Sequence, residues 1–170
     1  MEEISLHILD LVENSISAGA TRIEITVVED LKKDILKIRV KDNGKGMSEE
    51  EMKRVFDPFF TTKGKRTGLG LPLIKQSAEA TGGNVKVKSK KGKGTIVEAT
   101  FVYSHIDRQP LGDIGTTIAT LFLSHPEISF IYKHIKNGRK ICISSKKIVL
   151  SFNEIKEKIN SFIFNTTLKP

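Results

Sequence analysis

Residues 9–20 read Leu-Asp-Leu-Val-Glu-Asn-Ser-Ile-Ser-Ala-Gly-Ala and close the first regular element of the chain. Apolar side chains recur through this element at the spacing of one helix face. They are Ile4, Ile8, Leu11, Val12 and Ile16. Gly19 follows where helices commonly end in a left-handed residue. The pattern predicts a helix from Ile4 to Ala18, with Asp10 and Asn14 one turn apart on one face.

Alternating and helical patterns continue outward from this stretch. The predicted strands are 22–28, 35–40, 85–89 and 95–101, and the predicted helices are 48–55 and 71–81. Ser48, followed by three glutamates, is a suitable N-cap for the second helix. Helices in one layer and antiparallel strands in the other predict the α+β class, as a two-layer α/β sandwich.

A break at residues 107–113, which include Pro110 and Gly112, predicts a boundary between domain 1–106 and a small region 107–170. The C-terminal region has the expected order α-β-β-α, with a helix at 114–124, strands at 128–135 and 139–144, and a helix at 154–164. Asn137-Gly138 between its strands is typical of a hairpin turn. We expect this region to pack on the first domain as an appendage.

Composition excludes several classes of protein. The 170 residues contain no apolar stretch near the roughly 18 residues of a membrane span, and they begin with Met1-Glu2-Glu3 rather than a basic leader. One cysteine, Cys142, excludes an internal disulfide and a cysteine-only metal site. We therefore expect a cytoplasmic protein with no membrane association. Cys142, between two isoleucines, is interpreted as a packing residue in a strand.

The net charge of +8 could attract nucleic acid, an acidic protein or nucleotide phosphates. The chain has no tryptophan and two tyrosines, so it offers few platforms for base stacking, and we do not expect nucleic acid as its partner. The alternating lysines of 86–90 are typical of a solvated strand edge that resists aggregation.

Glycine clusters at 42–46, 64–70 and 92–95 are the first indication of a ligand-binding site. Gly68-Leu69-Gly70-Leu71 leads into a helix with Pro72 in its first turn, an arrangement that favours phosphate binding by backbone N–H groups. No GxxxxGK[ST] motif occurs, so an ordinary P-loop is excluded. The Asp10–Asn14 pair could hold a hydrated cation or position a water, or could simply be a polar helix face.

Four blocks in this order resemble the gyrase, chaperone, histidine-kinase and mismatch-repair (GHKL) ATPase superfamily. They are the N-box at 9–20, the glycine box Asp42-Asn-Gly-Lys-Gly-Met47, the second glycine box at 68–71, and Gly92-Lys-Gly-Thr95. Phe56-Asp-Pro-Phe-Phe-Thr-Thr-Lys63 is similar to the F-box of sensor histidine kinases. The resemblance covers residues 4–103 and implies the Bergerat ATP-binding fold with ATP and magnesium as ligands.

The resemblance also implies a role for each matched residue. Asn14 would coordinate magnesium, and Asp42 would accept the adenine amino group. Ala18, Gly44 and Gly46 would line the adenine pocket, and Thr95 would join the water network around Asp42. Lys63 and the amides of 68–71 would meet the phosphates beneath a short lid at 64–67. The implied nucleotide-binding set is Asn14, Ala18, Asp42, Gly44, Gly46, Met47, Lys63, Thr67, Gly68, Leu69, Gly70, Leu71 and Thr95.

The residues that would carry catalysis differ from those of known superfamily members. Only three residues precede the first helix, where a sensor kinase carries its phospho-accepting hairpin, so we do not expect autophosphorylation in cis. His7 is interpreted as a surface or packing residue. Hydrolytic members of the superfamily place a glutamate general base four residues before the magnesium asparagine, and this chain has Asp10 there. Asp10 is thus the candidate general base, one methylene shorter.

Three functions remain open. The first is an ATP-binding regulator, alone or as a subunit of a larger complex, that controls a protein partner through residues 107–170. The second is a kinase that acts in trans on a partner, as anti-sigma-factor kinases or a split histidine kinase would. The third is a weak ATPase subunit or a non-catalytic scaffold. The hairpin at 128–144, which could add strands to a partner's sheet, favours the first.

Overall fold

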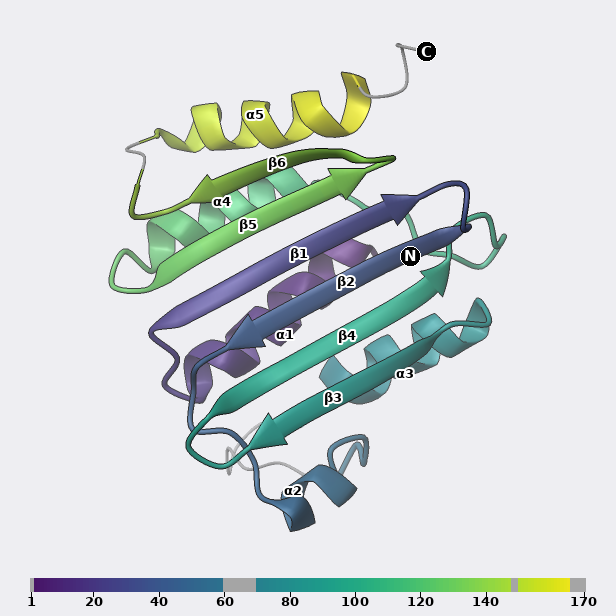
Figure 1. Ribbon diagram of the computed structural model, residues 1–170, viewed down its shortest axis with the longest axis vertical. Coiled ribbons are helices and arrows are strands. Elements are labelled where there is room, and N and C mark those ends of the chain that lie inside the picture. The colour runs from purple at the N-terminus through teal and green to yellow at the C-terminus, as the bar shows by residue number, and fades with distance from the viewer. Residues whose placement is uncertain (1, 60–69, 148–149, 166–170) are drawn as a thin grey trace.

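The structure is a computed structural model that describes residues 2–59, 70–147 and 150–165. A single mixed sheet, in the order β3-β4-β2-β1-β5-β6, runs through it (Figure 1). The strands are β1 (Arg22–Asp30), β2 (Ile35–Asp42), β3 (Asn84–Lys90), β4 (Gly94–Val102), β5 (Ser129–Lys136) and β6 (Arg139–Ser144). The helices are α1 (Ile4–Ser17), α2 (Glu49–Lys53), α3 (Gly70–Ala80), α4 (Ile114–Ser124) and α5 (Phe152–Asn165).

The core lies between the sheet and the helices α1, α3 and α4, which all cover the same face in Figure 1. Ile23, Ile25 and Val27 alternate along β1 and are fully buried on that side, as are Ile4 and Ile8 of α1. Apolar residues thus recur at every second position in β1 and at every third or fourth position in α1, and both sets face the same interface. This confirms the predicted α+β sandwich.

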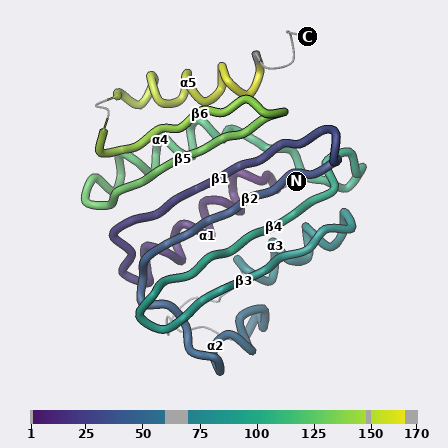
Figure 2. The backbone as a smooth tube through the Cα atoms, viewed as in Figure 1, coloured from purple at the N-terminus to yellow at the C-terminus, as the bar shows by residue number. Residues whose placement is uncertain are grey.

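Residues beyond the predicted boundary extend the sheet of the first part. β5 pairs in parallel with β1, from Arg22↔Ser129 to Glu29↔Lys136, and β6 pairs antiparallel with β5. In the backbone trace, α5 lies beside β6 at one end of the molecule and α2 lies beyond β3 at the other (Figure 2). Whether residues 1–106 fold as a domain by themselves stays a prediction.

The predicted turn between the last two strands is confirmed. Asn137 and Gly138 both have positive φ angles, 49° and 83°, as a two-residue type I′ hairpin turn requires. Because β5 lies between β1 and β6, only β6 of this hairpin has a free edge in the described part of the chain.

The opposite face of the sheet, which we call the open face, is turned to the viewer in Figure 1 and carries no helix of the described chain. Every second strand residue points there, among them Glu24 of β1, Lys133 of β5 and Cys142 of β6. Cys142 lies in a strand as expected, but its interpretation as a packing residue is wrong: it is exposed, because the alternation sends its neighbours Ile141 and Ile143 to the helical side.

The helices of the described residues are too short or too polar to cross a bilayer. His7, by contrast with Cys142, is a packing residue as expected: it is buried in α1, and its Nε2 lies 2.7 Å from Oε1 of Gln109.

Candidate functional site

Asp42, the last residue of β2, is held by both of its carboxylate oxygens. Its Oδ2 accepts a hydrogen bond of 2.6 Å from Oγ of Ser15 in α1, and its Oδ1 accepts one of 2.8 Å from the backbone N–H of Gly44. Ser15 is buried and Asp42 is half-buried. The carboxylate is thus fixed at the junction of β2, α1 and the first glycine box.

The first glycine box rests on the end of α1. A Cβ on Gly44 would lie 2.8 Å from the carbonyl oxygen of Ala18 and 2.9 Å from its Cβ, so glycine is required for this close approach. The N–H of Lys45 donates to the same carbonyl at 2.9 Å. The structure therefore brings Ala18, Asp42 and Gly44 together, as the resemblance implies.

The other end of the box meets the turn between β3 and β4. Gly46 has φ +69°, and a Cβ there would lie 2.0 Å from the carbonyl oxygen of Lys90. Gly94 has φ +96°, and its Cβ would lie 2.0 Å from the carbonyl oxygen of Asp42. Two glycine clusters that are distant in sequence are thus packed backbone to backbone behind Asp42.

A small hydroxyl network joins the same pieces. Ser89 Oγ accepts from the N–H of Met47 at 2.8 Å, donates to the carbonyl of Gly94 at 3.0 Å, and lies 2.7 Å from Oγ1 of Thr95. Thr95 is the direct partner of Asp42 in the β2–β4 register. Thr95 and Met47 therefore belong to the immediate surroundings of Asp42.

Asp10 and Asn14 face the start of α3. A Cβ on Gly70, the first residue of α3, would lie 3.3 Å from Cβ of Asp10 and 3.7 Å from Nδ2 of Asn14. The first N–H groups of a helix have no partner within it, and they carry the positive end of the helix dipole. Asp10 and Asn14 thus lie beside Gly70, at a helix end of the kind that favours a phosphate.

Four residues of the implied set, Lys63, Thr67, Gly68 and Leu69, lie outside the described residues. Phe56, at the start of the F-box, lies within the described residues and contacts α3. The ammonium of Lys75 in α3 lies 4.9 Å from the ring centroid of Phe56, which is a cation–π contact.

Three residues of the site were missed from the sequence. Ser15 orients Asp42, Ser89 holds Met47 and Thr95, and Asn43 accepts 2.9 Å hydrogen bonds from the N–H groups of Thr21 and Arg22. Ser15 lies in the N-box and Asn43 lies in the first glycine box, so their place in these motifs was a signal that could have identified them. Ser89 carries no local signal, because only the β3–β4 pairing brings it to the box.

The geometry fits a purine nucleotide with a metal ion bound to its phosphates. One end offers a carboxylate fixed by two hydrogen bonds beside a close glycine contact, and a carboxylate suits an exocyclic amine. The other end offers the carboxylate of Asp10, the amide of Asn14 and a helix N-terminus, which suits a hydrated magnesium ion and phosphates. No cluster of three histidine, cysteine or acidic side chains that could hold a metal by itself occurs among the described residues.

Comparison with known proteins agrees with this geometry. Residues 2–105 match the family described as "Histidine kinase-, DNA gyrase B-, and HSP90-like ATPase". The sensor histidine kinase ZraS of Escherichia coli K12 is 38% identical over 105 residues, which are 62% of this chain and 23% of that protein. Sporulation kinase E of Bacillus subtilis is 40% identical over 74 residues, or 44% of this chain and 10% of the kinase. The matched part is thus less than a quarter of either relative.

Two solved structures share the fold over 94% of this chain, and so beyond residue 105. The N-terminal domain of a DNA repair protein has a TM-score of 0.64 at 18% identity, with 57% of that chain covered. The MutL ATPase domain of Aquifex aeolicus, complexed with ADP, has a TM-score of 0.54 at 21% identity, with 69% covered. At these identities the likeness is one of fold.

Proposed function

The chain belongs to the histidine kinase-, DNA gyrase B- and HSP90-like ATPase family, and we propose that it is an ATP-binding regulatory protein that controls a protein partner. The observation that carries the proposal is the Asp42 carboxylate, held by Ser15 and by Gly44, whose close approach to Ala18 leaves no room for a side chain. In this proposal Asp42 accepts the adenine amino group, while Ala18, Gly44, Gly46, Met47 and Thr95 surround the base.

The phosphates lie in this proposal where α1 faces the start of α3. Asn14 holds the magnesium ion through its side-chain oxygen, and the first N–H groups of α3, from Gly70 and Leu71, meet the phosphates. Magnesium, when bound, neutralises part of the phosphate charge. Asp10, on the same face of α1, orients a water or accepts its proton.

The partner contacts the C-terminal part in this proposal. β6 is an edge strand of the sheet in the described part of the chain, and its neighbour β5 presents side chains on the open face that no described helix covers. The nucleotide state would act on the partner through the sheet, because β1 pairs with β5 and also precedes the β2 strand that ends in Asp42. We expect this role to be carried out in the cytoplasm, where ATP and magnesium are plentiful.

A second candidate is a kinase that transfers the γ-phosphate to a partner in trans. Its support is that the curated relatives are named kinases and match across 44–62% of this chain. A weak ATPase is the third, and its support is the position of Asp10 beside Gly70 and Asn14.

Calorimetric titration with ATP and GTP, with and without magnesium, tests the proposal. We expect ATP to bind in preference to GTP and magnesium to strengthen the binding. Equal affinities for the two nucleotides, or no binding, would contradict it. A pull-down with and without Mg-ATP identifies the partner, and incubation of that partner with γ-labelled ATP separates the two leading candidates. Transferred label supports the kinase, whereas tight binding without transfer or turnover supports the regulator.

A further inference from the structure

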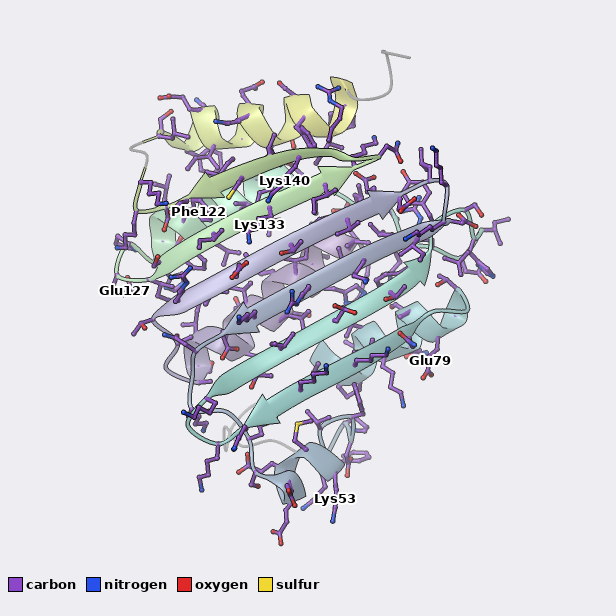
Figure 3. All side chains as sticks on the ribbon, in the orientation of Figure 1. Lys53, Glu79, Phe122, Glu127, Lys133 and Lys140 are labelled. Atoms are coloured by element: carbon purple, nitrogen blue, oxygen red, sulfur yellow. The ribbon has the colours of Figure 1, made fainter. Side chains whose placement is uncertain are left out.

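A hollow of about 380 Å³ opens on the open face of the sheet, opposite the face that α1 covers, and it borders the candidate nucleotide site because the N–H of its lining residue Arg22 donates to Asn43. It spans three neighbouring strands on the open face, since Arg22 pairs with Ser129 and Lys133 pairs with Cys142. Figure 3 shows Lys133 on the face of the sheet turned to the viewer. Its volume is at the lower end of the range of about 300–1,000 Å³ that small binding sites occupy.

The charged side chains that line the hollow are all cationic. They are Arg22 of β1, Lys133 of β5, and Lys146 and Lys147 of the turn after β6. Arg22, Lys146 and Lys147 are exposed, and none of the described carboxylates lines the hollow. Lys146 is held in place, because its Nζ donates to the carbonyl of Pro126.

Glu24 is the acidic neighbour on the open face, and it is already engaged. Its Oε1 lies 2.6 Å from Nζ of Lys133. That hydrogen bond, together with the charges of Lys133, Lys41 and Arg22, lowers the pKa of the Glu24 carboxyl despite the opposing effect of burial. The Glu24 charge thus offsets one lysine, and Glu127 is a second acidic neighbour, since a backbone hydrogen bond and the charge of Lys146 both lower its pKa. Four lining cations against these two carboxylates keep a positive potential in the hollow.

The rest of the lining is neutral and small. It consists of the hydroxyls of Ser129 and Ser144, the thiol of Cys142 and the aliphatic side chain of Ile131. No aromatic side chain among the described residues lines the hollow, so a nucleic acid would find no base-stacking platform. An aliphatic patch ringed by cations and hydroxyls fits a glutamate or aspartate side chain, whose stem is apolar and whose end is a carboxylate.

We propose that this hollow, which we call the basic hollow, binds an acidic segment of the protein partner. The inference rests on the proposed function for the existence of that partner and names its chemistry. It also gives the open face at β5 and β6 a role distinct from that at β3. The lysines of β3, Lys86, Lys88 and Lys90, are exposed and serve as a solvated edge.

Anisotropy of a fluorescein-labelled hexaglutamate peptide tests the proposal on the full chain. We expect saturable binding that weakens as NaCl is raised from about 50 to about 300 mM, because salt screens the attraction between exposed charges. Hexaglutamine, which has no charged side chains, should not bind. The double variant Arg22→Glu with Lys147→Glu should lose about tenfold in affinity. The matched control Lys86→Glu with Lys88→Glu changes the net charge equally on the same face and should lose about twofold or less. Equal losses in the two variants would overturn the proposal.

Cys142 provides a readout of location, because it is the single cysteine of the chain and lies exposed in the hollow. Hexaglutamate should slow its alkylation by N-ethylmaleimide several-fold, and hexaglutamine should not. Unchanged alkylation at saturating peptide would overturn the proposal. Tighter binding of a 24-base-pair DNA duplex that also protects Cys142 would overturn it in favour of nucleic acid.

The two proposals can fail separately. Circular dichroism establishes that each variant is folded, and ATP titration reports the candidate nucleotide site independently of the peptide. A chain that binds ATP but not hexaglutamate refutes only the basic hollow. A chain that binds the peptide but no nucleotide refutes the proposed function and leaves the hollow as an acidic-peptide site.

Discussion

Nε2 of His134 lies 2.7 Å from Oε2 of Glu29, and both side chains are fully buried. Glu29 belongs to β1, inside the part that matches the family, and His134 belongs to β5, outside it. The phenol of Tyr132 lies 2.6 Å from the other ring nitrogen of His134, and Tyr103 donates to the second oxygen of Glu29. A satisfied polar network thus joins the two parts of the chain beneath the sheet.

Replacing Glu29 by glutamine should lower stability and flatten its dependence on pH. Burial raises the pKa of the Glu29 carboxyl, but the hydrogen bond and charge of His134, with the charge of Lys136, hold that pKa below its ordinary value of 4.5. The unfolded chain therefore binds the proton more readily, so the stabilisation is complete above about pH 4.5 and is lost as the pH falls. We expect a loss of about 3 kcal/mol at pH 7.

Urea unfolding between pH 3.5 and 7 measures both effects. Glu24→Gln is the matched control, because Glu24 lies on the same strand and pairs with Lys133 on the solvent side, where such pairs contribute about 0–1 kcal/mol. Similar losses for the two variants would contradict the role of the buried pair.

Deletion of residues 107–170 should prevent the remaining chain from staying folded and monomeric. β1 would lose its pairing with β5 along 22–29 and become an edge strand, and Glu29 would lose His134. Size-exclusion chromatography and circular dichroism of residues 1–106 check this. A monomer with cooperative unfolding would instead show that the domain boundary predicted from the sequence is correct.

Asp42→Asn should weaken ATP binding by about 10- to 150-fold, since hydrogen bonds to charged groups contribute about 1.5–3 kcal/mol. The amide keeps the shape of the side chain, so the fold should survive. Asp30→Asn, at the other end of the neighbouring strand β1, is the control and should leave ATP affinity unchanged. Calorimetric titration measures the ATP affinity of both variants. An undiminished affinity of the Asp42 variant would contradict the proposed contact between Asp42 and adenine.

Asn14→Ala should abolish the part of ATP affinity that depends on magnesium, because it removes the proposed metal ligand. Asp10→Asn should retain binding and lose any hydrolysis or phosphoryl transfer. Glu13→Gln is the control, because Glu13 lies between them in α1 but is exposed. Titrations with and without magnesium, together with a phosphate-release assay, separate the three variants. Full turnover by the Asp10 variant would exclude it as the general base.

Gly46→Ala should destabilise the chain more than Gly92→Ala. Both glycines have positive φ, 69° and 79°, so both substitutions carry a conformational cost of about 1–2 kcal/mol. Only at Gly46 would the new Cβ meet an atom, the carbonyl oxygen of Lys90 at 2.0 Å, while the space around Gly92 is open within 4 Å. Urea unfolding of the two variants measures the steric part as the difference between them. Equal losses would mean that the glycine box adjusts to a side chain.

The short-range features of this chain were predictable because they depend on neighbours in sequence. The helix at Ile4, the N-cap at Ser48 and the Asn137-Gly138 turn all follow from local periodicity or backbone preference, and the structure confirms them. Ser89 could not be assigned, since its position beside Thr95 depends on the pairing of two strands. Cys142 was placed wrongly because a run of apolar residues does not reveal which face of the strand each one occupies.

The sequence by itself determined the class of fold, the order of the four motifs and the residue types available to a nucleotide. Those depend on composition, spacing and backbone preference, which are properties of single segments. Only the tertiary structure decided that Asp42 is held by Ser15, that β5 and β6 continue the sheet beyond β1, and that the cations of β1, β5 and the last turn surround one hollow. Each of these features arises from contacts between segments that are distant in sequence. The pattern of residues along the chain does not specify the register between strands or which segments face one another.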